Sequence, residues 1–187
     1  MKVTKIKLGC DPELFLEDKN GNIISAEGKI GGTKSEPTPI SDKGHAIQED
    51  NVMIEFNIPP STSSEEFVNN INFVKDHLEA MVRLDDCKLN ISASATLDDK
   101  YLQSEQAKMF GCEPDFNVHL KEVNEAPEAS GNLRTAGGHI HVGYDNPQEE
   151  ISEQIIYAMD AVLGLESINL DQDDRRREMY GKAGAFR

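Results

Sequence analysis

Residues 137–143 read Gly-Gly-His-Ile-His-Val-Gly, and this stretch carries the clearest signal in the chain. Side chains alternate between the two faces of a strand, so His139 and His141 share one face while Ile140 and Val142 share the other. The aliphatic face can pack on a core while both imidazoles face a cavity. Such a pair can bind a metal or a phosphate, and a half-buried strand that merely carries two histidines has the same pattern.

A second segment, residues 47–58, repeats this division into a polar and an apolar face. As one strand, it places acids and amides on one side and aliphatic or aromatic side chains on the other. The polar face holds Glu49, Asn51, Glu55 and Asn57, and the apolar face holds Val52, Ile54, Phe56 and Ile58. We therefore predict a strand whose acids face a cavity.

The same alternation occurs near the N-terminus, where Asp11 and Glu13 share one side and Leu14 and Leu16 the other. Acids together with imidazoles form the ligand set of divalent metals. The residues that we predict to converge on one metal are Glu13, Glu49, Glu55, His139 and His141. Asp11 is not included in this set, because capping a turn before Pro12 is an alternative role for its carboxylate. The competing interpretation of all three segments is amphipathic strands whose polar faces meet only water.

The composition limits the class of protein. A chain of 187 residues predicts a single domain, 1–187, with a real core. A formal net charge of −15 argues against a nucleic-acid surface and against anionic membranes. No stretch approaches the ~20 apolar residues of a membrane span, and the N-terminus lacks the apolar core of a signal peptide. An odd number of cysteines, Cys10, Cys87 and Cys112, suggests structural thiols in a reducing cytoplasm.

The periodicity places two helices and several strands. One helix begins with a capping box at Ser63–Glu66, and the second has Asn146 as its cap and Pro147 as its first residue. A shorter helix is expected over 101–110. Strands are expected at 2–8, 13–17, 22–26, 47–58, 88–94 and 138–144, with a hairpin turn at 18–21. Because turns join the early strands, we predict an α+β fold with a mostly antiparallel sheet and helices on one face.

Two segments are candidates for anion binding. Residues 31–34, Gly-Gly-Thr-Lys, form a glycine-rich loop with one lysine but lack the spacing of a P-loop, and taken alone they are explained better by a plain surface loop. Residues 173–187 contain four arginines, one lysine and two glycines in an otherwise acidic chain. Guanidinium groups bind phosphate and carboxylate oxygens in pairs, and glycines let backbone N–H groups join them. The alternative is an Arg/Asp surface network.

Five motifs occur together in one order: Gly-Cys-Asp-Pro-Glu-Leu-Phe, Gly-Gly-Thr-Lys, Gln-Glu-Asp-Asn-Val-Met-Ile-Glu-Phe-Asn, Gly-Gly-His-Ile-His-Val-Gly and Arg-x-x-Tyr-Gly-Lys-Ala-Gly-Ala-Phe-Arg. In this order the chain, from residue 8 to residue 187, resembles the phage-type COOH.NH2 ligases. These amidoligases belong to the superfamily of glutamine synthetase and glutamate–cysteine ligase. The resemblance implies a glutamine-synthetase-like antiparallel sheet that curves around an ATP and metal site.

The resemblance also implies roles for individual residues. Glu13, Glu49 and Glu55 correspond to metal-binding acids, and His139 and His141 to the histidine strand beside metal and phosphate. Arg177, Lys182 and Arg187 correspond to a clamp on the nucleotide and substrate phosphates. Glu55, Arg177 and Arg187 are then the catalytic residues, and Lys34 joins the clamp in binding ATP. Mg²⁺ is the expected metal, and a histidine in its shell makes Mn²⁺ a substitute.

The implied reaction joins a carboxylate and an amine, from small molecules or peptides, through an acyl phosphate made with ATP. The family continues past the last motif into a further strand, so three expectations stay open: the site is incomplete without the terminal strand, the sequence is a fragment, or a partner chain in an oligomer completes the site. By resemblance the chain is phage-encoded and acts in the host cytoplasm. Two alternatives stay open: a metal-dependent hydrolase or oxygenase that uses the His-x-His pair, and a non-catalytic nucleotide- or metal-binding module with the ligase fold.

Overall fold

The computed structural model describes residues 3–108, 115–125 and 131–187, apart from the side chains of Arg177 and Glu178. Contacts within the chain divide it into two compact units. Unit 1 comprises Met1–Phe110 and Gly131–Asp145, and unit 2 comprises Gly111–Ser130 and Asn146–Arg187. The expectation of one domain over residues 1–187 stays a prediction.

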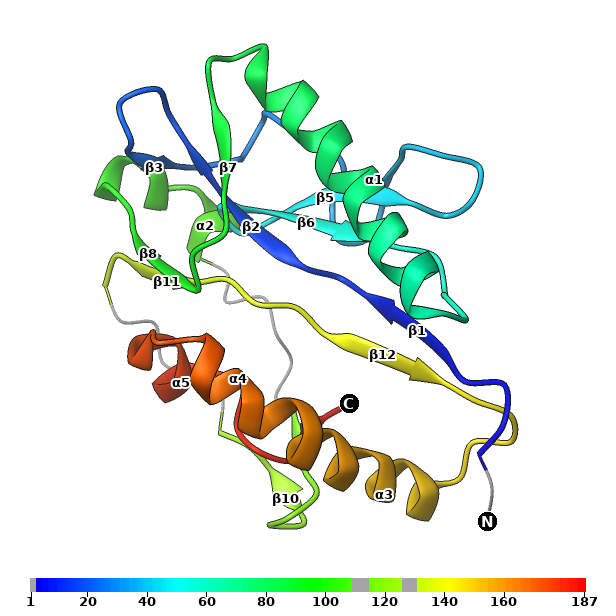
Figure 1. Cartoon of the computed structure of the whole chain (residues 1–187). Coiled ribbons are helices and arrows are strands. Elements are labelled where there is room, and N and C mark those ends of the chain that lie inside the picture. The colour runs from blue at the N-terminus through cyan, green and yellow to red at the C-terminus, as the bar shows by residue number, and fades with distance from the viewer. Residues whose placement is uncertain (1–2, 109–114, 126–130) are drawn as a thin grey trace. The chain divides into compact units, whose positions relative to one another are not determined.

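Unit 1 is built on an antiparallel sheet with the strand order β3-β2-β6-β5-β4, in which β7 also pairs with β2 (Figure 1). Its strands are β2 (Glu13–Glu17), β3 (Ile23–Ile24), β4 (Thr38–Pro39), β5 (Ala46–Asp50), β6 (Met53–Asn57) and β7 (Lys88–Asn90). Two further antiparallel pairs join β1 (Lys7–Cys10) to β12 (Ile140–Gly143), and β8 (Ser94–Thr96) to β11 (Leu133–Thr135). The α+β class with an antiparallel sheet is therefore confirmed.

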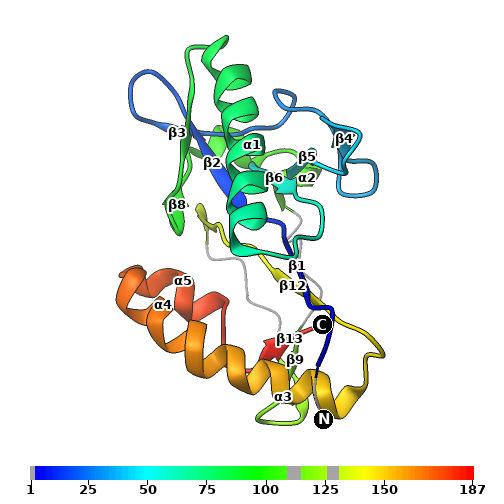
Figure 2. The same ribbon diagram turned by 45° about the vertical axis from the view of Figure 1, so that its right-hand side comes forward.

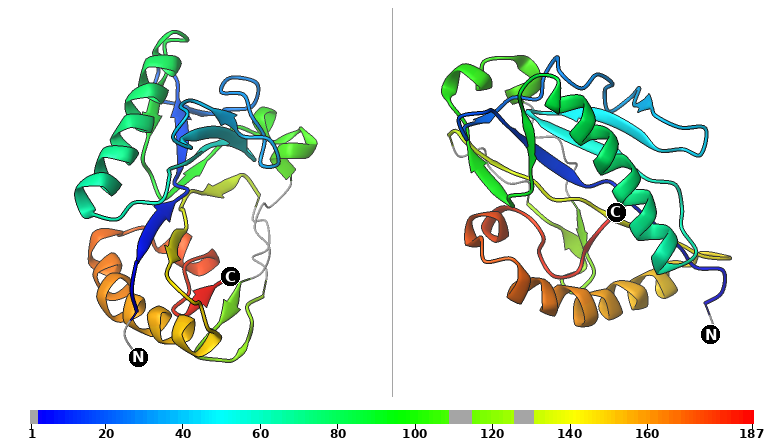
Figure 3. Two further views of the ribbon diagram at one scale, coloured as in Figure 1. Left: turned by 90° about the vertical axis from the view of Figure 1, so that its right-hand side faces the viewer. Right: turned by 45° about the horizontal axis from the view of Figure 1, so that its top comes forward.

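Strands β1 and β2 follow each other as one extended segment that lies between β6 and the chain entering β12 (Figure 3). On one edge, the N–H of Phe56 donates to the carbonyl of Pro12 at 3.2 Å. On the other edge, the N–H of Glu13 donates to the carbonyl of Gly137 at 2.8 Å. Proline has no N–H to give, and here only its carbonyl is used in the pairing. The segment thus connects the sheet to the histidine strand.

Helix α1 (Ser64–Arg83) covers one face of this sheet (Figure 1). The hydroxyl of Ser63 accepts from the N–H of Glu66 at 3.2 Å, which confirms the predicted helix start. Its buried side chains pack with those of the sheet in one core that includes Leu14, Leu16, Ile54, Phe56, Val74, Leu78 and Val82. A second core on the opposite face joins Phe15 and Met53 to side chains of β8, η1 (Asp99–Leu102) and α2 (Glu105–Lys108). The prediction of helices on one face therefore holds for α1 and not for η1 and α2.

Residues 47–58 form a hairpin and not the single predicted strand. Asp50 pairs with Met53, so Asn51 and Val52 make a two-residue turn. Asn51 has φ +56, a left-handed conformation that asparagine tolerates better than most residues. Its amide Nδ2 donates to the carbonyl of Ala107 at 3.1 Å, so it is part of the turn's support and not of a strand face.

Other element boundaries also differ from prediction. The strand expected at 2–8 lies at Lys7–Cys10, and the one expected at 88–94 divides into β7 and β8. The helix expected over 101–110 is replaced by η1 and α2, while residues 109–110 lie outside the described part of the chain. The turn at 18–21 is confirmed, with the N–H of Gly21 donating to the carbonyl of Asp18 at 3.0 Å.

In unit 2, the second predicted helix begins at Glu149 and not at Pro147, because Asn146 has φ +52 instead of the extended backbone of a helix cap. Three helical segments then follow without interruption (Figure 2): α3 (Glu149–Met159), the π-helical η2 (Asp160–Gly164) and α4 (Leu165–Leu170). After α5 (Asp174–Met179) comes β13 (Ala185–Phe186), the last strand. It pairs with β9 (Phe116–Asn117), which also pairs with β10 (Glu122–Val123), and the three form an antiparallel sheet.

No helix among the described residues has the length and apolar character needed to cross a membrane. Cys10 and Cys87 are free thiols, and Cys112 lies outside the described residues. Burial, followed by the charge of Asp11, raises the pKa of Cys10 to about 11, which agrees with a structural thiol.

Gly138 provides a test of the contact between the β1–β2 segment and the chain entering β12. A Cβ at this position would lie 2.9 Å from Pro12 Cα and 3.1 Å from the Asp11 carbonyl oxygen. These are backbone atoms, so Gly138→Ala is expected to lower the free energy of unfolding by roughly 1–3 kcal/mol in urea titrations. Gly143→Ala is the control, because its Cβ would meet Lys7 O at an ordinary 3.9 Å. Equal losses in both variants would contradict the packing described.

Candidate functional site

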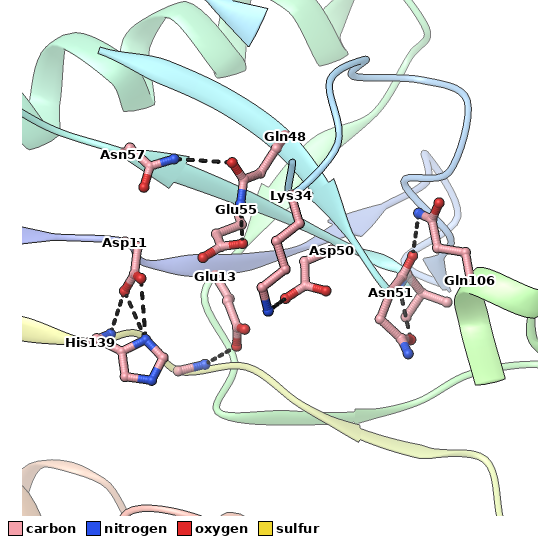
Figure 4. A network of polar contacts seen from close by, with 12 residues as sticks. Asp11, Glu13, Lys34, Gln48, Asp50, Asn51, Glu55, Asn57, Gln106 and His139 are labelled. Carbon is pink, nitrogen blue, oxygen red and sulfur yellow. Dashed lines mark hydrogen bonds and ion pairs between the residues drawn. The ribbon is translucent and has the colours of Figure 1, made fainter. Parts of the chain in front are cut away.

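One face of the sheet in unit 1 becomes polar where the β1–β2 segment meets β6 and β12. Directly paired residues of antiparallel strands point to the same face, and the pairs here are Glu13 with Glu55, Gln48 with Glu55, and Gly9 with His141. The polar face therefore collects side chains from β5, β6, β12 and the β1–β2 segment (Figure 4). Its members are Asp11, Glu13, Gln48, Asp50, Glu55, Asn57, His139 and His141.

Asp11 connects both histidines of the predicted pair. Both of its carboxylate oxygens lie 3.2 Å from Nδ1 of His139, and Oδ2 lies 3.3 Å from Nε2 of His141. One ligand atom from each of these residues lies within 4.8 Å of the other two. Burial raises the pKa of Asp11, but hydrogen bonds from His139 outweigh it, and the pKa lies below its ordinary value. Asp11 is thus an ionised carboxylate between two imidazoles, an arrangement that can hold a divalent cation.

Glu13 and Glu55 are acids that the fold holds in register. Burial raises the pKa of Glu13 to about 7, with further increases from the charges of Asp50 and Glu55. Its Oε2 accepts from the N–H of Gly137 at 2.8 Å. Burial also raises the pKa of Glu55, although its hydrogen bond with Gln48 acts in the opposite direction. Two buried carboxyls side by side favour a proton or a cation between them, so this part of the face is suited to a metal ion.

Lys34 extends from the glycine-rich loop onto the same face (Figure 4). Its Nζ lies 3.8 Å from Oδ2 of Asp50, and its charge lowers the pKa of Glu55. Nearby, the amide of Asn57 donates to Oε1 of Gln48 at 3.1 Å. The lysine that the sequence marks as a phosphate ligand therefore lies beside the acids that the sequence marks as metal ligands.

Glu49 is not on this face, which corrects the prediction that it joins the metal ligands. Glu49 pairs with Ile54, and Ile54 is fully buried in the core on the side of α1. Its carboxylate accepts hydrogen bonds from the consecutive backbone N–H groups of residues 28–31, at 2.9 to 3.1 Å. Such a row of N–H groups is an anion-binding nest, here occupied by the protein's own carboxylate. Glu49 holds the glycine-rich loop in place.

The predicted phosphate clamp belongs to unit 2. Arg187 places its Nε 3.3 Å from Oδ1 of Asp115, an ion pair within that unit. Lys182 is exposed, and the side chain of Arg177 lies outside the described residues. The convergence of these three residues with the acids of unit 1 stays a prediction.

The structure adds three residues to those that the sequence selected. Asp11 has the same alternation as Glu13, two positions away, and this signal was present in the sequence. Gln48 and Asp50 were missed because residues 47–58 were counted as one strand. In the β5–β6 hairpin each even-numbered residue of β5 lies opposite an odd-numbered residue of β6. Gln48 and Asp50 therefore share a face with Glu55, and Glu49 does not.

Comparison of the chain with models of protein families, with curated proteins and with solved structures finds no significant match.

The raised pKa of Glu13 predicts that stability depends on pH. In the fold this pKa is about 7, against an ordinary value of 4.5, so the folded state holds the proton more tightly than the unfolded chain. The stabilising contribution is fully present below the unfolded pKa and is lost as the pH rises through about 7. In metal-free urea titrations, wild type should lose roughly 1–3 kcal/mol relative to Glu13→Gln over this window. The exposed Glu65 supplies the control, Glu65→Gln, and a wild type that gained stability instead would refute the assignment.

Metal affinity should separate Asp11 from Glu49. Asp11→Asn removes the charge that lies between the two imidazoles and is expected to weaken Mn²⁺ binding by roughly 10–100-fold in calorimetric titrations. Glu49→Gln, whose carboxylate lies on the opposite face, is expected to lower stability while leaving the Mn²⁺ affinity of the folded protein unchanged. A loss of affinity in Glu49→Gln equal to that in Asp11→Asn would show that the two faces are wrongly assigned.

Proposed function

We propose that the chain is an ATP-dependent carboxylate–amine ligase that forms an amide through an acyl phosphate. The observation that carries this proposal is the convergence of Asp11, Glu13, Glu55 and His139 on one face of a rigid antiparallel sheet. The order of the sequence motifs points in the same direction.

The chemistry of the reaction explains why such a face is needed. A carboxylate does not react with an amine in water until its oxygen is made a leaving group, and transfer of the γ-phosphoryl group of ATP achieves this. Negative charge is spread over the phosphoryl oxygens during the transfer and requires cations fixed in advance. Carboxylates supply the hard oxygen ligands that Mg²⁺ prefers, and an imidazole nitrogen makes Mn²⁺ an acceptable substitute.

In this proposal the residues of unit 1 have distinct roles. Glu13 and Glu55 hold Mg²⁺ as carboxylates, and the bound cation would favour loss of their protons despite burial. Asp11 orients His139 and His141 and shares in metal binding. Lys34, beside Asp50, contacts the phosphates of ATP. Arg177, Lys182 and Arg187 of unit 2 are proposed to bind the nucleotide and the acyl phosphate, a role that rests on the motif resemblance.

A second candidate function is favoured by one observation. Asp11, His139 and His141 are two imidazoles and a carboxylate around one point, a ligand set that also serves metal-dependent hydrolases. Nucleotide dependence distinguishes the two functions, because such a hydrolase needs no ATP. ATP binding without turnover would indicate the third alternative, a binding module with the ligase fold.

The decisive experiment measures ADP release from ATP and Mg²⁺ with a panel of amino acids and peptides. We expect release that requires both an acid and an amine, with ADP and inorganic phosphate as products. Glu55→Gln should abolish turnover and leave the fold intact by circular dichroism, because Glu55 lies on the polar face and outside the core. Glu65→Gln, on an exposed position of α1, is the matched control. AMP and pyrophosphate as products, or equal turnover in Glu55→Gln, would contradict the proposal.

A further inference from the structure

A second set of polar residues in unit 1 lies outside the polar face described above. It begins in the turn between β4 and β5 and includes Ser41, His45 and Asn70 of helix α1. His45 is only 3% exposed, and both of its ring nitrogens have partners. Nδ1 lies 2.7 Å from Oγ of Ser41, and Nε2 lies 3.0 Å from Oδ1 of Asn70. The imidazole also packs against the ring of Phe73, with 4.6 Å between centroids.

The hydrogen-bond network fixes the direction of the contact between Asn70 and His45, and with it the tautomer of a neutral imidazole. The hydroxyl of Ser61 donates to the carbonyl of Pro59 at 3.3 Å and accepts from Nδ2 of Asn70 at 3.0 Å. The amide oxygen of Asn70 therefore faces His45 and accepts a proton from Nε2. A neutral imidazole with its proton on Nε2 has a lone pair on Nδ1, so the hydroxyl of Ser41 donates to His45. The histidine is held as a base toward the serine.

We propose that Ser41 is a nucleophile for acyl transfer, with His45 as its general base and Asn70 as the residue that positions the base. This is the arrangement of nucleophile, base and orienting group found in serine and cysteine hydrolases on unrelated folds. Ser41 is half-buried and reachable from solvent, whereas His45 is shielded. The backbone N–H of Lys43 also donates to Oγ of Ser41 at 3.2 Å and would stabilise negative charge on that oxygen.

A cavity lies beside this group and gives room for a substrate. Its volume is about 560 Å³, and it is lined by Lys43, Pro59, Ser63, Glu65, Glu66, Asn69 and Asn70. Hydroxyl, amide, ammonium and carboxylate groups make this lining polar. The substrate class that fits is a small, polar ester or another activated acyl group, for which water is the final acceptor.

The reaction balances with the substrate and water alone. Oγ of Ser41 attacks the acyl carbon while its proton moves to Nδ1 of His45, and the resulting imidazolium keeps its Nε2–H on Asn70. The bond to the leaving alcohol breaks as that oxygen takes the proton from Nδ1, which leaves an acyl ester on Ser41. Water then attacks the ester, gives its proton to Nδ1, and the acid leaves as Oγ regains the proton. No metal or nucleotide takes part, so the activity is independent of the proposed ligase.

The test uses the full chain with EDTA present, a fluorophosphonate probe and p-nitrophenyl acetate. We expect one covalent adduct, mapped to Ser41 by peptide mass spectrometry, and ester hydrolysis that Ser41→Ala removes. Ser35→Ala, at an exposed hydroxyl in the same unit, should retain both. Persistence of labelling and hydrolysis in Ser41→Ala, or absence of any adduct on Ser41 in the folded wild type, would overturn the proposal.

The role of Asn70 is tested by two variants. Asn70→Ala should slow labelling by roughly tenfold or more, since the base loses its orientation. Asn70→Asp, which keeps an acceptor for Nε2–H, should restore the rate. If Asn70 were purely structural, both variants would change the midpoint of urea unfolding, and Asn70→Asp would not restore the labelling rate. Labelling of folded Asn70→Ala at the wild-type rate would also contradict the proposal.

Discussion

The pairing of one extended segment, β1 followed by β2, with β6 on one edge and the chain entering β12 on the other determines the rest of unit 1. Pro12 lies at the centre of this segment and offers only a carbonyl to the pairing, which Phe56 uses. The close approach of Gly138 to Pro12 holds the histidine strand against the other edge. Through these contacts Glu13 shares a face with Glu55, which is 42 residues away, and Asp11 contacts His139, which is 128 residues away.

This arrangement buries carboxyl groups, which raises the pKa of Glu13 and of Glu55. The same sheet face is apolar at Phe15 and Met53 and becomes acidic one pair along, at Glu13 and Glu55. Glu13 resists ionisation because water is excluded from it, and Asp11 does not because two imidazoles lie beside its carboxylate. Neighbouring acids whose pKa values are shifted in opposite directions are typical of functional sites. A buried carboxyl costs stability, and a purely structural face does not need one.

Much of this face could be predicted from the alternation of residue types along the chain. The alternation in residues 137–143 correctly put His139 and His141 on one side, and Ser63 correctly marked the start of α1. Glu49 was assigned to the wrong face because the two-residue turn at 51–52 changes which residues of β5 lie on the same face as Glu55. Periodicity alone does not reveal a turn inside an unbroken alternating pattern. Asn146 failed as a helix cap because its backbone is left-handed, with φ +52, and the residue type alone does not reveal this. The Ser41–His45–Asn70 group had no sequence signal at all, because helix α1 brings Asn70 to the turn through tertiary packing.

The contact of Glu49 with the glycine-rich loop has a consequence for recognition. The nest formed by residues 28–31 is already filled by the Glu49 carboxylate, so it has no open N–H groups for a phosphate, while the side chain of Lys34 reaches the opposite, polar face beside Asp50. The loss of backbone freedom in the loop occurs when the chain folds and not when a ligand arrives. Binding would then need to order little more than one lysine side chain, which lowers the entropic penalty of capturing an anion.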